Sequence, residues 1–117
     1  AKLFRSVLDA AREFGAAVPG LMPKETVKQL TRDGFVEQTY TRSLLSAVQT
    51  PQVFERALLV EAYTEAMQDR FVGTDDASLV EYFGSRVRVV QGEEDNIKIT
   101  TQLDFRLAEL ILSSRMA

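Results

Sequence analysis

The spacing of apolar residues divides the chain into amphipathic helices and short strands. From Leu3 to Phe14, apolar side chains recur at helical spacing with charged residues between them, and Gly15 suits the end of that helix. The small apolar residues 16–20 then predict a buried strand. A helix that leads directly into a strand is typical of the middle of an α/β fold, so we expect further chain upstream.

The polar segment 25–40 has a different pattern. Two β-prone runs, residues 26–30 and 35–40, flank the sequence Thr31-Arg32-Asp33-Gly34, and Asp-Gly between such runs predicts a β-hairpin. A lone hairpin with few apolar side chains is at best marginally stable in water, so it should rest on another surface. That surface belongs either to the same chain or to a second subunit, and the polar composition favours the second subunit.

The remainder of the chain alternates between helices and strands. After a further short strand, one helix is expected beyond Pro51 and another between the capping sequence Thr74-Asp75-Asp76 and Gly84. Residues 86–90 and 97–99 have the alternation of strands, and Thr101-Gln102-Leu103-Asp104 resembles a capping box that opens the last helix. The apolar stripe expected on the second helix consists of Phe54, Leu58, Leu59, Ala62, Ala66 and Met67, and that on the last helix of Leu103, Leu107, Leu110 and Ile111.

This order of elements predicts an α/β fold, in which a sheet is layered by helices and the polar hairpin is an insertion. We expect one domain over residues 1–117, with the hairpin forming an arm at about 25–45.

Composition removes several kinds of chemistry. The 117 residues include 14 Lys and Arg against 17 Asp and Glu, a net charge of −3, with neither Cys nor His. Disulfides, thiolate sites, Ser-His-Asp triads and imidazole-bound zinc are therefore excluded from this sequence. Interspersed charges of mildly acidic balance argue against nucleic acid as the partner, and no apolar run approaches the ~20 residues of a membrane span. A reducing compartment such as the cytoplasm is expected.

Two positions combine phosphate-binding chemistry with a suitable place in the predicted fold. Lys98 lies between Ile97 and Ile99, where a strand emerges from the polar loop 92–96. A cation at the end of a sheet strand can meet a phosphate, although a solvent-facing lysine on an edge strand explains the pattern too. Thr50, in the turn Gln49-Thr50-Pro51-Gln52, can offer its hydroxyl and backbone N–H groups to an anion, or can serve in an ordinary turn or helix cap.

The ends of the hairpin and the acidic pair form two further candidates. Thr26 and Lys28 begin the hairpin and Arg42 follows it, so a hairpin folded onto a neighbour would bring them to that neighbour's ligand; surface charge at a strand end is the plainer alternative. The carboxylates of Asp75 and Asp76 suggest a metal site, but helix capping explains them without a ligand.

Five segments in the same order strongly resemble the carboxy-terminal part of the 2-C-methyl-D-erythritol 4-phosphate cytidylyltransferase family. Each is weak alone, and their shared order is specific. They are Glu25-Thr26-Val27-Lys28, Thr41-Arg42, Gln49-Thr50-Pro51-Gln52-Val53-Phe54, Thr74-Asp75-Asp76-Ala77-Ser78-Leu79-Val80-Glu81 and Asn96-Ile97-Lys98-Ile99-Thr100.

The resemblance implies a Rossmann-like nucleotidyltransferase with helices on both faces of its sheet. Such an enzyme joins a polyol phosphate to CTP, giving CDP-methylerythritol and pyrophosphate in non-mevalonate isoprenoid biosynthesis, with Mg²⁺ or another divalent cation bound mainly through CTP. It further implies a homodimer in which the arm embraces the partner. By motif match, Thr26 and Arg42 contact the substrate in the partner's site, Thr50 and Lys98 line the same pocket, and Lys98 and Arg42 are the catalytic candidates.

The sequence departs from the family pattern at two places. Glu25 stands where the family usually has Asp, which leaves the hydroxyl of Thr26 and the charge of Lys28 in place. The family's glycine-rich CTP loop has no counterpart, so the chain alone is expected to be inactive. Two alternatives stay open: a cytidylyltransferase for another polyol phosphate such as ribitol 5-phosphate, and a non-catalytic dimerisation fragment. The expected location is the cytoplasm, or a plastid in a plant.

Overall fold

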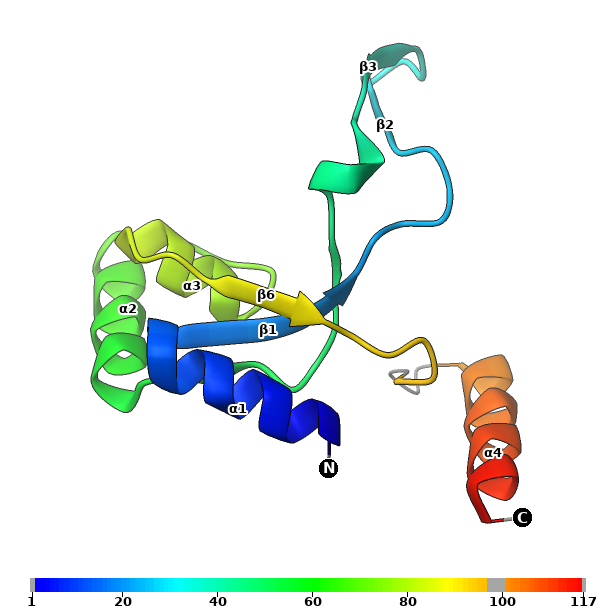
Figure 1. Cartoon of the computed structure of the whole chain (residues 1–117). Coiled ribbons are helices and arrows are strands. Elements are labelled where there is room, and N and C mark those ends of the chain that lie inside the picture. The colour runs from blue at the N-terminus through cyan, green and yellow to red at the C-terminus, as the bar shows by residue number, and fades with distance from the viewer. Residues whose placement is uncertain (1, 97–100, 117) are drawn as a thin grey trace.

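The computed structural model describes residues 2–96 and 101–116. It shows a small sheet packed between helices, a hairpin arm that projects from one end of the sheet, and a last helix set beside the body (Figure 1). The elements in chain order are α1 (Lys2–Phe14), β1 (Ala16–Leu21), β2 (Lys28–Leu30), β3 (Val36–Thr39), the 3-10 turn η1 (Arg42–Leu44), β4 (Ala47–Val48), β5 (Val53–Phe54), α2 (Arg56–Gln68), α3 (Asp76–Phe83), β6 (Arg88–Gln91) and α4 (Gln102–Met116).

Strand β1 is the centre of the main sheet. It runs parallel to β6, with Val18 opposite Val89, and antiparallel to the two short strands β4 and β5, which pair with its opposite ends. Residues 16–20 are all buried, because strands flank β1 on both edges and helices cover both faces. The expected buried strand is therefore confirmed.

Alternate residues of β1 pack against different helices. Ala17 contacts the buried Val7 and Ala11 of α1, whereas Ala16 contacts Ala62 of α2 and Val80 of α3. Successive side chains of a strand point to opposite faces, so two neighbouring alanines belong to two separate clusters. The expected sheet with helices on both faces is confirmed.

The polar segment forms the expected hairpin. In β2 and β3 Lys28 lies opposite Thr39, and the described residues of both strands are exposed. The turn is closed by the Thr31 amide donating to the Phe35 carbonyl at 2.8 Å, and Gly34 has a φ of +93°, which glycine adopts readily. The arm is thus defined by local turn chemistry and not by burial.

The predicted apolar stripe of the second helix is wrong at its two ends. Helix α2 begins only at Arg56 because Glu55 is its N-cap, accepting from the amides of residues 57 and 58, and Phe54 belongs to β5 instead. Met67 is 77% exposed, so it contributes little to the core. The strand predicted at 86–90 begins at Arg88, and the one predicted at 97–99 lies outside the described residues.

Helix α4 begins with the expected capping box but does not bury the expected stripe. The hydroxyl of Thr101 accepts from the Asp104 amide at 3.0 Å, and the Asp104 carboxylate accepts from the Thr101 amide at 3.1 Å. Leu103 and Leu110 are 75% and 67% exposed and Leu107 is 43% exposed, whereas Ile111 of the expected stripe is half-buried and lines a cavity together with Ala108 and with Leu3 and Phe4 of α1. Helical spacing shows which residues share a face, but it does not show which face meets a partner. None of the helices in the described ranges is both long and apolar enough to cross a membrane.

Candidate functional site

A cavity of about 420 Å³ opens at the end of the main sheet where β4 and β6 finish. Its walls come from the turn between β4 and β5, the start of α3 and the loop after β6. This volume falls within the range of small-ligand pockets. The lining residues are Val48, Gln49, Thr50, Gln52, Thr74, Asp75 and Asn96.

Thr50 stands in this cavity wall with its hydroxyl available. Its backbone carbonyl accepts from the Asn96 side-chain amide at 2.5 Å, and the peptide bond to Pro51 is cis. Among the described residues the Thr50 hydroxyl has no hydrogen-bond partner, and α2 is capped by Glu55. Helix capping of α2 is therefore not the role of Thr50, which lines the cavity.

The two glutamines around Thr50 are engaged by the protein. Gln52 donates to the Asp75 carboxylate at 3.0 Å and accepts from the Ala77 amide at 3.3 Å, which ties the turn to the start of α3. Gln49 bonds to the loop after β6. The role of Thr50 as a binding residue stays a prediction, whereas the amides of Gln49 and Gln52 have structural partners that their sequence positions do not show.

The acidic pair at the start of α3 serves the structure. Asp75 is the N-cap, accepting from the Ser78 amide at 2.8 Å within a capping box. Asp76 accepts from the hydroxyl of Tyr63 at 2.5 Å, and this hydrogen bond raises the pKa of Tyr63. No group of three or more carboxylates that could hold a metal ion occurs within the described residues. Capping is thus the better of the two interpretations.

Thr74, directly before this cap, was not singled out by sequence reasoning as a binding residue, yet it lines the cavity beside Thr50. The sequence feature that could have indicated Thr74 is a hydroxyl residue directly before a helix cap. This feature is also common at helix starts that bind no ligand.

The arm residues do not line this cavity in their own chain. Thr26 and Arg42 are exposed, and Arg42 donates from its guanidinium to the Lys24 carbonyl at the base of the arm. Lys28 donates to the Thr39 hydroxyl at 2.8 Å. The arm extends away from the sheet (Figure 1), so one subunit alone does not join Arg42 with Thr50.

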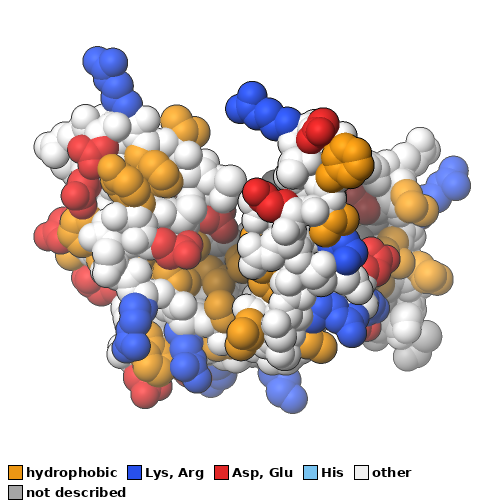
Figure 2. Space-filling model, turned by 90° about the horizontal axis from the view of Figure 1, so that it is seen from above, with side chains coloured by type: hydrophobic (Ala, Val, Ile, Leu, Met, Phe, Trp, Pro, Cys, Tyr) orange, Lys and Arg blue, Asp and Glu red, His pale blue; other side chains and the backbone are white. Residues whose placement is uncertain are grey.

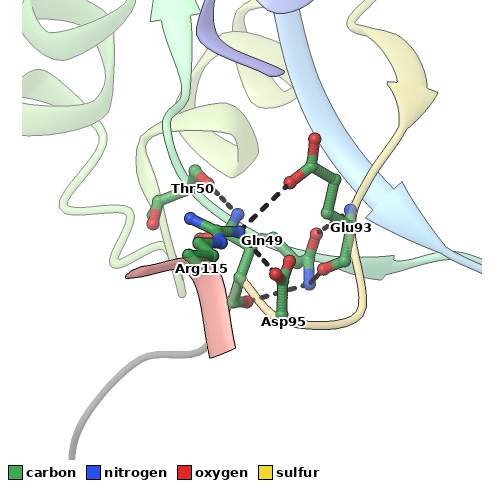
Figure 3. Close-up of polar contacts among 6 residues, drawn as sticks. Gln49, Thr50, Glu93, Asp95 and Arg115 are labelled. Atoms are coloured by element: carbon green, nitrogen blue, oxygen red, sulfur yellow. Dashed lines mark hydrogen bonds and ion pairs between the residues drawn. The ribbon is translucent and has the colours of Figure 1, made fainter. Parts of the chain in front are cut away.

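Lys98 lies outside the described residues, but the loop that leads to it is well connected (Figure 3). Glu94 pairs with Lys24 at the arm base at 3.3 Å, while Asp95 pairs with Arg115 of α4. Asn96, two positions before Lys98, lines the Thr50 cavity. The loop 92–96 therefore contacts the Thr50 turn, the arm and α4.

The surface around the arm carries mixed charge. Figure 2 shows acidic, basic and apolar side chains interspersed over this face, without a continuous basic area among the described residues in view.

Comparison with known proteins gives one result throughout. The family model described as 2-C-methyl-D-erythritol 4-phosphate cytidylyltransferase matches residues 1–114. The protein of that name from Geobacillus thermodenitrificans is 52% identical over 110 residues, which cover 93% of this chain and 47% of the relative. The one from Symbiobacterium thermophilum is 51% identical, covering 96% of this chain and 48% of the relative.

Solved structures agree with the sequence relatives. The 4-diphosphocytidyl-2C-methyl-D-erythritol synthase of Anaerococcus prevotii superimposes with a TM-score of 0.87 at 37% identity, over 96% of this chain and 52% of that one. The Thermus thermophilus cytidylyltransferase gives a TM-score of 0.81 at 38% identity, over 94% and 54%. The chain thus spans about half the length of the relatives it matches. With nearly all of its residues matched by one family model, the chain belongs to the 2-C-methyl-D-erythritol 4-phosphate cytidylyltransferase family.

Proposed function

We propose that the full-length enzyme, meaning this chain together with the part that only its relatives show, transfers a cytidylyl group from CTP to 2-C-methyl-D-erythritol 4-phosphate. The products are CDP-methylerythritol and pyrophosphate, in non-mevalonate isoprenoid biosynthesis. The observation that carries the proposal is the cavity shared by Thr50 and Asn96, in a chain whose family has this activity in its name. There the turn of Thr50 meets the loop that leads to Lys98.

The reaction suits a chain without His or Cys. A phosphate oxygen of the polyol phosphate attacks the α-phosphorus of CTP, and the bond to the pyrophosphate oxygen breaks. The nucleophile is already ionised, so the enzyme must mainly align the two reactants and neutralise their charge. In this proposal Lys98 and Arg42 supply positive charge, and the hydroxyls of Thr26 and Thr50 orient the polyol phosphate.

The arm supports a homodimer as part of the proposal. Leu30, Phe35 and Val36 are 58%, 69% and 55% exposed, an unusual set of apolar side chains for a free hairpin. A partner subunit that receives the arm would cover them and would take Thr26 and Arg42 at its own substrate pocket. Replacing residues 26–40 by a short Gly-Ser linker should then yield monomers in light scattering; an unchanged dimer contradicts this interface.

We propose that the divalent cation binds mainly through the phosphates of CTP. Because the described residues form no carboxylate cluster, this part of the chain offers no protein cage for Mg²⁺. Mg²⁺ commonly binds through substrate phosphates and only one or two carboxylates, so delivery with CTP fits this part of the chain. Since CTP is a cytoplasmic metabolite, we also propose a cytoplasmic location, or a plastid in a plant.

A competition assay tests the reaction. The full-length enzyme is given CTP with equal amounts of methylerythritol 4-phosphate and ribitol 5-phosphate, and both CDP products are quantified. Preferential formation of CDP-methylerythritol supports the proposal. Exclusive formation of CDP-ribitol selects the alternative substrate, and a stable dimer that neither binds CTP in calorimetry nor releases pyrophosphate selects the non-catalytic dimerisation module.

A further inference from the structure

The side-chain amide of Gln49 is fully engaged by the backbone of the loop 92–96 (Figure 3). Its nitrogen donates to the carbonyls of Glu93 at 2.9 Å and Asn96 at 3.0 Å, and its oxygen accepts from the Glu93 amide at 3.3 Å. Two carbonyls face the nitrogen and an N–H group faces the oxygen, so the partners themselves determine the orientation of the amide. One side chain therefore spans a gap of 44 to 47 positions in sequence.

The loop approaches this amide closely. The Gly92 amide donates to the Gly20 carbonyl at 2.9 Å, and a Cβ atom at Gly92 would lie only 2.2 Å from the Gln49 side-chain oxygen. A second bond, from the Asn96 side-chain amide to the Thr50 carbonyl at 2.5 Å, connects the next pair of residues. The turn and the loop are thus held together at consecutive positions, 49 and 50 on one side and 93 to 96 on the other.

The other side-chain contacts of the loop include three ion pairs that are more exposed. The Lys24–Glu94 pair has side chains 80% and 70% exposed, and Arg115, 58% exposed, reaches Glu93 at 3.9 Å and pairs more closely with Asp95, which is 37% exposed. Exposed ion pairs are screened by water and salt and contribute little. The Gln49 hydrogen bonds are partly buried, and breaking them would take this partner from the Asn96 carbonyl and the Glu93 amide, whereas the Glu93 carbonyl still accepts from the Asn96 amide at 3.1 Å. Gln49 therefore provides the partly buried side-chain hydrogen bonds between the loop and the Thr50 turn, while Arg115 joins the loop to α4.

We propose that Gln49 is a positioning residue. It fixes the loop 92–96, which leads to Lys98, against the turn that carries Thr50. This inference rests on the proposed function, because it assigns Lys98 and Thr50 to one substrate pocket. Gln49 itself does not touch the substrate in this account. It acts by holding Asn96, the last described residue before Lys98, against the turn that carries Thr50.

Variants of the full-length enzyme test the inference. Gln49→Met keeps length and removes all three hydrogen bonds, whereas Gln49→Glu keeps an acceptor for the Glu93 amide but sets carboxylate oxygen against two carbonyls. We expect kcat/KM for the polyol phosphate to fall about tenfold in Gln49→Met and further in Gln49→Glu, with the KM for CTP nearly unchanged. Gln68→Met, at an exposed position near the end of α2, is the matched control and should behave as wild type.

A double-mutant cycle separates positioning from general stability. If Gln49 acts through Lys98, then Gln49→Met has little further effect once Lys98 is Ala, and the two losses are far from additive. Additive losses, or an equal rise in the KM for CTP, overturn the inference.

Amide hydrogen exchange makes this test independent of activity. Residues 92–96 should exchange at least several-fold faster in Gln49→Met, while β1 remains protected. If the wild-type enzyme makes no CDP product, the proposed function fails. The exchange data still show whether Gln49 holds the loop 92–96 in place. Unchanged exchange of 92–96 in both Gln49 variants overturns the inference.

Discussion

The sheet body and the hairpin arm are stabilised in different ways. In the body, β1 is buried between α1 and the pair α2 and α3, and its alanines contact side chains distant in sequence. In the arm, every residue of β2 and β3 is exposed, and side-chain hydrogen bonds such as those of Lys28, Tyr40 and Arg42 join residues of the same hairpin or its base. The body thus depends on burial, whereas the arm takes its shape from a turn and a short ladder.

This difference is the reason that the proposed dimer interface is assigned to the arm. Burying apolar surface contributes roughly 25 cal/mol per Å², so the body gains stability from its own core. A lone two-stranded hairpin gains little and is marginal in water. The arm has a defined shape but little buried surface of its own. In the proposed dimer, the partner subunit supplies the surface on which the arm packs.

Replacing a valine by aspartate should affect the unfolding free energy very differently in the two regions, and this is the largest effect that we expect. Val80→Asp places an unpaired carboxylate among Ala16 and Ala62, at a position with 0% exposure. We expect a loss of about 4 kcal/mol or more, comparable with the whole stability of a small domain. Val36→Asp in the arm, 55% exposed in a single subunit, should change the unfolding free energy of the subunit by less than about 0.5 kcal/mol, and its cost should appear as weaker dimerisation instead. Urea denaturation followed by circular dichroism measures both, and equal losses would remove the distinction.

Variants of the two catalytic candidates, Lys98 and Arg42, test whether the arm acts in the partner's site. Lys98→Ala and Arg42→Ala should each lower kcat/KM of the full-length enzyme about a hundredfold, or roughly 3 kcal/mol. Mixed after subunit exchange, the two variants should recover about a quarter of wild-type activity, because half of randomly paired dimers regain one intact site of two.

Recovery in that mixture needs Arg42 to act across the interface. A mixture of wild type with the double variant supplies the control for subunit exchange, and Lys2→Ala, on the exposed side of α1, controls for loss of any lysine. Full loss in each variant with no recovery would place both cations in the same subunit's site.

Glycines in the two regions are required for opposite reasons. At Gly92 the limit is space, since an added Cβ meets the Gln49 amide oxygen at 2.2 Å; at Gly34 there is no atom within 4 Å, but φ is +93°. Gly92→Ala should cost about 1–3 kcal/mol and Gly92→Asn more. Gly34→Ala should cost about 1 kcal/mol and Gly34→Asn less, because Asn tolerates positive φ. Thermal unfolding of the four variants shows whether Ala or Asn is the more destabilising residue at each site. The same order of Ala and Asn at both sites would contradict the two different reasons given for these glycines.

The smallest effect is expected for the hydrogen bond between α3 and the end of α2. Tyr82 stacks on Phe71 with centroids 4.1 Å apart and donates to the Asp69 carboxylate at 2.6 Å, a bond that raises the pKa of Tyr82 above its usual 10.0. A raised pKa in the folded state means that this stabilisation is complete below pH 10 and is lost as the pH rises through the raised value. Tyr82→Phe keeps the stack and should be slightly less stable at pH 8.

That small difference should shrink above pH 10. Urea midpoints of the wild type and Tyr82→Phe, measured between about pH 8 and 11, should converge at the alkaline end. A constant gap across this range would show that the hydroxyl bond does not control it.

Local sequence determined the elements whose signals lie within a few residues. Gly15 ends α1 with a φ of +90°, Asp75 caps α3, and Asp33-Gly34 closes the hairpin, each through backbone geometry or a hydrogen bond to a near neighbour. The continuous run of small apolar residues at 16–20 likewise predicted a buried strand, which β1 is. Thr50 was proposed as a candidate for the same reason, as part of a short turn motif.

Tertiary structure alone decided the contacts that join distant segments. Gln49 and Asn96 gave no sign in the sequence that they hold a loop to a turn, since hydrogen bonds across more than 40 positions depend on the packing of β1 against β4 and β6. The exposure of Leu103 and Leu110 on α4 also followed from which face found a neighbour. Periodicity specifies a helix or strand and the faces it has, whereas the choice among those faces is made by burial of the whole chain.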